Sequence, residues 1–181
     1  MSNLISLRPW QNDDLEYFYQ IYSRTEVARW VGAQPRRVVA NLEEAQTKLA
    51  SYQKLHNEST YPCGLWAIIP AGSNAPVGTA LLLPLKKDGV ITDQFEIGWH
   101  LHPDWWGKGL ATESAKVLLA LAKEAGISRV LALCDPDNDK SFAVMQRLQM
   151  HDGGITEDWY GLPLRQAIWL EKEESPYKPD L

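Results

Sequence analysis

Hydrophobic residues recur along the chain with two different spacings, which predict a mixture of helices and strands. Helical spacing marks residues 12–23, 41–55, 111–126 and 138–150, and short apolar runs typical of strands mark 4–10, 64–70, 76–85, 94–102, 129–135 and 167–172. Asn41 is positioned to cap the second helix, and the clearest helix, 111–126, ends at Gly126. This order predicts an α/β (or α+β) fold with a central mixed sheet.

Composition and charge narrow the classes of protein. The 181 residues are 45% hydrophobic and 23% charged, which is typical of a globular domain, and the net charge of −5 argues against a nucleic-acid binder. No apolar run reaches the roughly 18 residues that a membrane span needs, and no leader-like segment opens the chain. We therefore expect a cytoplasmic protein without a membrane partner, whose cysteines, Cys63 and Cys134, are reduced and buried.

Two closely spaced glycines stand between a predicted strand and the clearest helix. The stretch HPDWWGKGLATE, residues 102–113, places Gly107 and Gly109 on either side of a lysine. Glycines leave backbone amides accessible, and the first turn of a helix attracts negative charge, so this turn is suited to binding phosphate groups. A plain turn from strand to helix would use the same residues. Neither the Walker pattern GxxxxGK[ST] nor the dinucleotide pattern GxGxxG is met.

The surroundings of these glycines resemble a known family. The segment EIGWHLHPDWWGKGLATESAKVLLALA, followed by DPDNDKSFAVMQRLQM, resembles the GCN5-related N-acetyltransferases (GNAT family) and is most similar to their RimJ/RimL-like branch. The family's pyrophosphate-loop pattern, [Q/R]-x-x-G-x-[G/A], falls on residues 106–111, with Trp106 in place of Gln or Arg. Asn138 and Ser141, which open the last predicted helix, match a second mark of the family. The resemblance runs from about Leu7 to the last strand.

The resemblance implies a fold, a co-substrate and a set of binding residues. We expect a single domain over residues 1–181, with a core of about 7–172 and a flexible tail at 173–181, built on a twisted, mostly antiparallel sheet of six to seven strands flanked by about four helices. Acetyl-CoA is the implied co-substrate, without a metal. The residues implied to contact it are Trp99, His100, Leu101, Trp106, Gly107, Lys108, Gly109, Leu110, Ala111, Thr112, Asn138 and Ser141.

The implied reaction is direct attack of a primary amine on the thioester of acetyl-CoA. It needs a proton acceptor, a donor for the oxyanion and assistance for the leaving thiolate. The resemblance implies that strand 94–102 splays from strand 129–135 and that pantetheine pairs with the freed edge, which makes the Leu101 amide our expected oxyanion donor. Ser141, one helical turn after Asn138, is the candidate to assist the thiolate; the alternative is an ordinary serine at a helix start.

Glu96 and the neighbouring histidines are the candidate bases. By strand alternation Glu96, His100 and His102 share one face. We choose Glu96, acting through water, because a carboxylate also attracts the protonated amine; binding the cation of the substrate is an equally suitable role, and His100 is the second candidate base. A metal at the two histidines lacks a visible fourth ligand. Tyr160 is only a distant substitute for the tyrosine acid that the family often has after the segment LQM.

The expected acceptor is a primary amine, either a protein N-terminal α-amine or a small molecule. Trp66, Glu157 and Asp158 are candidate walls for a cationic amine, although solvated surface acids would have the same sequence. Two alternatives stay open: an acyltransferase that uses another acyl-CoA, and a non-catalytic CoA-binding or regulatory module of the same fold. Many relatives are dimers, so the resemblance also admits a homodimer.

Overall fold

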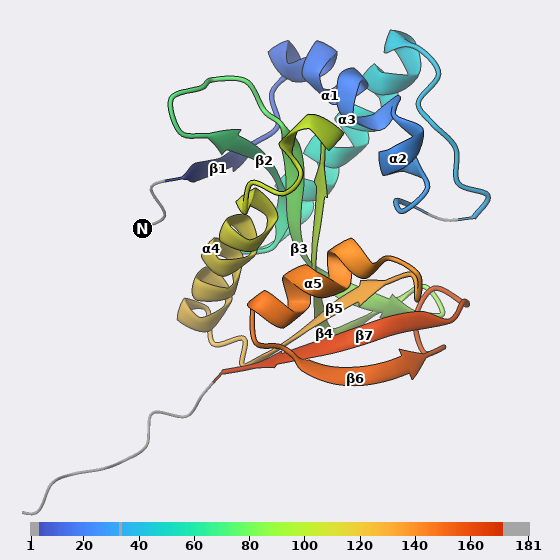
Figure 1. The fold of residues 1–181 in the computed structure, drawn as a ribbon, viewed down its shortest axis with the longest axis vertical. Coiled ribbons are helices and arrows are strands. Elements are labelled where there is room, and N and C mark those ends of the chain that lie inside the picture. Colours follow the sequence, from blue (N-terminus) through green and yellow to red (C-terminus); the bar gives the residue numbers. More distant parts are fainter. Residues whose placement is uncertain (1–3, 33, 172–181) are drawn as a thin grey trace, which may run out of the picture.

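A seven-stranded sheet forms the centre of the structure, a computed structural model that describes residues 4–32 and 34–171 (Figure 1). The strands are β1 (Ile5–Pro9), β2 (Gly64–Pro70), β3 (Gly78–Lys87), β4 (Val90–Leu101), β5 (Arg129–Cys134), β6 (His151–Thr156) and β7 (Leu164–Leu170). They lie in the order β1-β2-β3-β4-β5-β7-β6, and every neighbouring pair is antiparallel except β4 and β5. The expected mixed, mostly antiparallel α/β sheet is confirmed.

The helices that flank the sheet follow the predicted spacing, with one addition. In the described part of the chain they are α1 (Leu15–Tyr22), α2 (Thr25–Ala28), α3 (Leu42–Glu58), α4 (Leu110–Glu124) and α5 (Asp139–Arg147), with 3-10 turns at η1 (Asn12–Asp14) and η2 (Pro103–Trp105). Asn41 caps α3 as expected, because its side chain accepts a hydrogen bond from the Glu44 amide at 2.9 Å. No described helix is long and apolar enough to cross a bilayer. The expected tail, 173–181, lies outside the described residues.

Two elements have no signal in the hydrophobic pattern. The helix α2 has only four residues, too few for a helical period to appear. The strand β6, with the sequence HDGGIT, lacks the alternation of a half-buried strand because all of its residues except Thr156 are exposed. It forms the first strand of the last hairpin and lies at an edge of the sheet.

Helices cover both faces of the sheet. On one face Leu118 of α4 and Met145 of α5, each at most 1% exposed, belong to the same core cluster as Ile97 of β4. On the other face α1 and α3 pack on β2, with the fully buried Phe18 and Ala67 in one cluster. Because successive residues of a strand point to opposite faces, the central strand β4 supplies side chains to both layers.

The strands β4 and β5 separate after a short stretch of pairing. Of β4, only Phe95–Ile97 pair with β5, whereas the pairing with β3 continues to Leu101. The His102 amide donates to the Val77 carbonyl at 2.9 Å, on the β3 side. Since hydrogen-bonding directions alternate along a strand, the N–H groups of Trp99 and Leu101 point to the other side, where β5 has diverged. The splay that the resemblance implied is present.

Candidate active site

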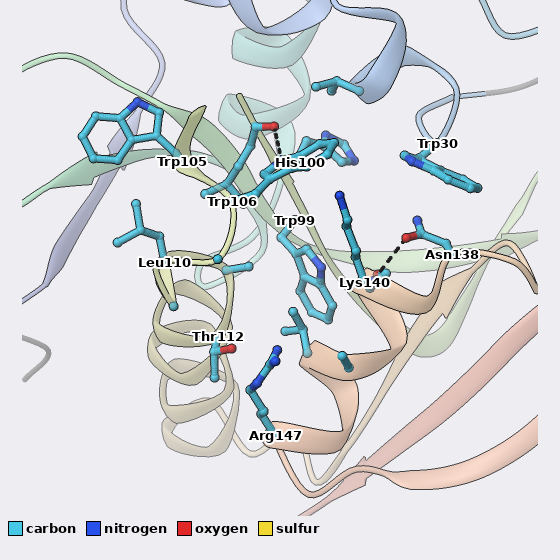
Figure 2. Close-up of a pocket in the computed structure, with 18 of the residues that line it drawn as sticks. Trp30, Trp99, His100, Trp105, Trp106, Leu110, Thr112, Asn138, Lys140 and Arg147 are labelled. Carbon is cyan, nitrogen blue, oxygen red and sulfur yellow. Dashed lines mark hydrogen bonds between the residues drawn. The ribbon is translucent and has the colours of Figure 1, made fainter. Parts of the chain in front are cut away.

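A cavity of about 620 Å³ opens where β4 and β5 diverge (Figure 2). Its walls come from the end of β4, the loop 106–109, the first turn of α4, the helix α5 and the segment 27–31. Of the expected cofactor-binding residues, all but Lys108 line it: Trp99, His100, Leu101, Trp106, Gly107, Gly109, Leu110, Ala111, Thr112, Asn138 and Ser141. The ammonium group of Lys108 lies instead over the Trp105 ring, 4.4 Å from its centroid.

The glycine loop has the backbone that an anion site requires. Gly107 and Gly109 have φ values of +73° and +78°, in the left-handed region that glycine favours, and a Cβ at either position would meet nothing within 4 Å. Gly109 immediately precedes α4, whose first-turn amides have no intrahelical acceptor. The Trp106 indole N–H donates to the Leu101 carbonyl at 2.8 Å, which ties the loop to the end of β4. Backbone donors and the positive end of a helix therefore face the cavity.

Two cations of α5 were missed by the sequence analysis. Lys140 and Arg147 are seven residues apart, so they lie on one side of the helix, and both line the cavity opposite the start of α4 (Figure 2). The Lys140 ammonium group lies 4.2 Å from the centroid of the Trp106 ring. In the sequence, the seven-residue spacing of these two basic residues was the only sign that they share one side of a helix. The cavity thus has the cations of α5 on one side and the positive end of the α4 dipole on the other.

Asn138 and Ser141 lie together at the start of α5. The Asn138 side-chain oxygen accepts a hydrogen bond from the Ser141 amide at 3.2 Å, so Asn138 caps the helix. The Ser141 side chain hydrogen-bonds the thiol of Cys134, and burial raises the pKa of that thiol to about 11. Because the thiol stays protonated near neutral pH, Cys134 is a weak nucleophile, in agreement with the expected buried core cysteine.

Glu96 lies on the β4 face that carries α1 and α3, and it is not a lining residue of the cavity. It is half-buried, and the Tyr160 hydroxyl donates a hydrogen bond to its carboxylate. Burial raises the pKa of Glu96 to about 7, although the Tyr160 hydrogen bond acts in the opposite direction. The turn between β6 and β7 therefore brings Tyr160 onto the candidate base, a contact that the sequence did not predict.

The two histidines have different environments. The Nδ1 of His100 lies 3.2 Å from the Tyr22 hydroxyl, and burial together with the positive charge of Lys48 lowers the pKa of His100 to about 4. His102 lies beyond the end of β4, where its Nδ1 accepts a hydrogen bond from the Asp104 amide at 3.3 Å. Of the three side chains that were expected on one face of the strand, only Glu96 and His100 therefore belong to β4. Within residues 4–32 and 34–171, no group of three or more His, Cys, Asp or Glu could hold a metal ion.

The expected acceptor walls have other contacts in the structure. Trp66 packs edge-on against His56, with ring centroids 4.5 Å apart, and does not line the cavity. Asp158 pairs with Lys87 at 3.4 Å. Trp30, with its neighbours in the segment 27–31, forms an apolar wall that the sequence analysis did not predict.

A family model described as the acetyltransferase (GNAT) domain matches residues 5–151. The chain belongs to the GNAT family. YnaD of Bacillus subtilis (strain 168), described as an uncharacterized N-acetyltransferase, is 38% identical over 62 residues. That match spans 34% of this chain and 36% of YnaD, about a third of each.

Solved GNAT structures share the fold. An acetyltransferase of this family from Bacillus anthracis superposes with a TM-score of 0.75 at 22% identity, over 94% of this chain and 96% of that chain. A RimL ribosomal L7/L12 alpha-N-protein acetyltransferase in complex with coenzyme A has a TM-score of 0.74 at 17% identity, over 94% and 96% of the two chains. These structures share the fold of the acetyltransferase (GNAT) domain that the family model identifies in this chain.

Proposed function

We propose that this GNAT protein transfers an acetyl group from acetyl-CoA to a primary amine by direct attack of the amine on the thioester. One observation carries the proposal. The turn before α4, which is suited to binding an anion, and the unpaired edge at the end of β4 line the same cavity. A ligand for both would have phosphate groups for the turn and an arm with amide groups for the strand edge. Acetyl-CoA has a pyrophosphate and a pantetheine arm, and so meets both requirements.

The donor occupies the cavity in a definite direction. Its pyrophosphate binds the amides of residues 107–112, and Lys140 and Arg147 of α5 neutralise phosphate charge from the opposite wall. The pantetheine arm pairs with the edge of β4 near Trp99 and Leu101, in the manner of an added strand. The Asn138 cap uses only the side-chain oxygen, so the side-chain nitrogen is available to donate to pantetheine.

The proposed reacting groups come from β4 and from the start of α5. Glu96 accepts a proton from the amine through water, and a pKa of about 7 makes it a better base near neutral pH than His100, whose pKa is about 4. The Leu101 amide, which points to the splay, donates to the oxyanion. The Ser141 hydroxyl assists the departing thiolate. Glu96, Leu101 and Ser141 are therefore the proposed catalytic residues.

The acceptor is a protein N-terminal α-amine or a small-molecule amine. The RimL neighbour, which is named for acetylating an α-amine of ribosomal L7/L12, supports the former and a RimJ/RimL-like assignment. The rival uses of this fold are transfer from another acyl-CoA and CoA binding without catalysis. The cytoplasmic location and a homodimer also remain predictions.

The decisive experiment measures CoA release with acetyl-, propionyl- and succinyl-CoA against peptides with free N-termini, polyamines, aminoglycosides and amino acids. Turnover with acetyl-CoA and at least one amine supports the proposal. Faster turnover with another donor would identify a different acyltransferase. Tight acetyl-CoA binding without turnover on any amine would favour a binding module.

A further inference from the structure

The turn between β6 and β7 presents a tyrosine in an unusual backbone conformation. Tyr160 has φ +60°, a left-handed value that a bulky residue rarely adopts, and Gly161 follows with φ +67°. The preceding Trp159 is only 8% exposed and packs in a small cluster with Leu85 and Leu131, which anchors the turn to the sheet. Tyr160 itself is 60% exposed. Its conformation is therefore not explained by burial of its ring.

The contact that Tyr160 makes explains the conformation. Its hydroxyl donates to the carboxylate of Glu96, which is 64 residues away in the sequence. The turn is held on its other side by Asp158, which accepts a hydrogen bond from the Thr156 hydroxyl at 2.9 Å and pairs with Lys87 at the end of β3. A strained residue that persists at such a place indicates a functional constraint.

The surroundings of Glu96 leave Tyr160 as its specific partner. Its cross-strand neighbours, Leu83 on β3 and Leu131 on β5, are apolar. In the described part of the chain, only burial and the hydrogen bond of Tyr160 set its pKa. The other ionisable groups on this face lie on β4, α1, α3, β5, β3 and the turn. They are His100 on β4, Tyr22 on α1, Lys48 and Tyr52 on α3, Arg129 on β5, Lys87 on β3 and Asp158 in the turn.

We propose that Tyr160 is a positioning residue, which holds the Glu96 carboxylate in one orientation and in its anionic form for the incoming amine. The inference rests on the proposed function, in which Glu96 takes the proton of the amine. Tyr160 keeps its own proton throughout, because its pKa is raised both by the loss of water around the hydroxyl at the contact with Glu96 and by the charge of that carboxylate. The turn between β6 and β7 therefore sets the protonation state of a base that belongs to β4.

The first test needs no acceptor. The carboxyl carbons of ¹³C-labelled glutamate are titrated by NMR in the free protein, and the Glu96 signal is identified by its loss in Glu96→Gln. In Tyr160→Phe the carboxylate loses a charge-assisted hydrogen bond, so its titration should move to higher pH by about one unit or more. Tyr61→Phe is the matched control, since Tyr61 is 65% exposed. An unchanged titration in Tyr160→Phe would overturn the inference.

The second test is the pH dependence of kcat/KM with an amine from the acceptor panel. With a higher Glu96 pKa, Tyr160→Phe should be about tenfold slower than the wild type near pH 6 and close to it above about pH 9. A uniform loss at every pH would mean that the hydroxyl contacts the acceptor or the fold, and the inference would fail. Full activity of Glu96→Gln would instead remove Glu96 as the base, while the NMR titration would still report on the contact.

A glycine substitution separates the strain from the contact. Tyr160→Gly removes both the hydroxyl and the cost of a positive φ, so the melting temperature should not fall, whereas the Glu96 titration should move as it does in Tyr160→Phe. A marked loss of stability would show that the side chain is kept for packing, against the inference.

Discussion

Replacement of Gly109 by aspartate would test the phosphate site directly. At Gly109 the backbone has φ +78°, and a Cβ would meet nothing within 4 Å, so the new side chain enters the cavity and not the protein core. Aspartate is among the residues that tolerate this conformation best, at a cost of about 1–2 kcal/mol. Its negative charge lies beside the positive end of α4, which stabilises the folded protein by about 0.3–1 kcal/mol. The free energy of unfolding should therefore fall by only about 1 kcal/mol, which leaves the protein folded.

Binding of acetyl-CoA should change far more than stability. The carboxylate occupies the region assigned to the pyrophosphate and competes for the same backbone amides. Each charge-assisted hydrogen bond is worth about 1.5–3 kcal/mol, so the loss of one weakens binding by about tenfold or more, and the loss of two by about a hundredfold or more. Repulsion between the carboxylate and the phosphates adds to this loss.

Titration calorimetry with acetyl-CoA, together with a melting curve, measures both quantities. Gly109→Asn adds the same volume without the charge and should lose less affinity than Gly109→Asp. Gly126→Asp is the positional control, because Gly126 follows the other end of α4 with φ +77° and an equally open Cβ position. Wild-type affinity in a folded Gly109→Asp protein would refute the assignment of phosphate to this turn.

Three further predictions concern the remaining roles. Glu96→Gln should cut kcat/KM at least tenfold near pH 7, with the deficit shrinking at higher pH as free amine accumulates, while His100→Gln should cost little; the reverse pattern would make His100 the base. Asn138→Ala should raise the KM for acetyl-CoA and lose about 1 kcal/mol of stability with the cap, and Ser141→Ala should mainly lower kcat; normal kinetics in both would leave only a helix cap. Lys140→Gln should weaken acetyl-CoA binding more as the salt concentration falls, and an unchanged salt dependence would exclude a phosphate contact.

The donor side of the site could be predicted because its signals are local. The strand, the turn with Gly107 and Gly109, and the helix α4 follow one another within residues 94–124. Helical and strand periods, glycine at positive φ and the helix dipole all act over a few residues, so a single sequence contains them. The cap at Asn138 is readable for the same reason, since its partner is the amide of Ser141.

Charges that converge from separate elements are harder to predict. Lys140 and Arg147 occur in a helix with ordinary amphipathic spacing, and nothing in their neighbourhood along the chain links them to a turn some 30 residues earlier. Only the divergence of β4 and β5 makes α5 the wall opposite α4. In the structure the Lys140 ammonium group lies over the ring of Trp106, the residue that stands in place of Gln or Arg in the family's loop pattern.

The contact of Tyr160 with Glu96 depends on three features that no local pattern contains. The strand β6 is exposed and glycine-rich, so the hairpin that brings Tyr160 back to β4 has no hydrophobic alternation. The tyrosine has a backbone conformation for which its residue type gives no signal. Burial raises the pKa of the Glu96 carboxylate to about 7, and the turn between β6 and β7 reaches this carboxylate through Tyr160. A base of this kind is a property of the assembled layers, and its pKa can therefore be changed from the turn without altering β4.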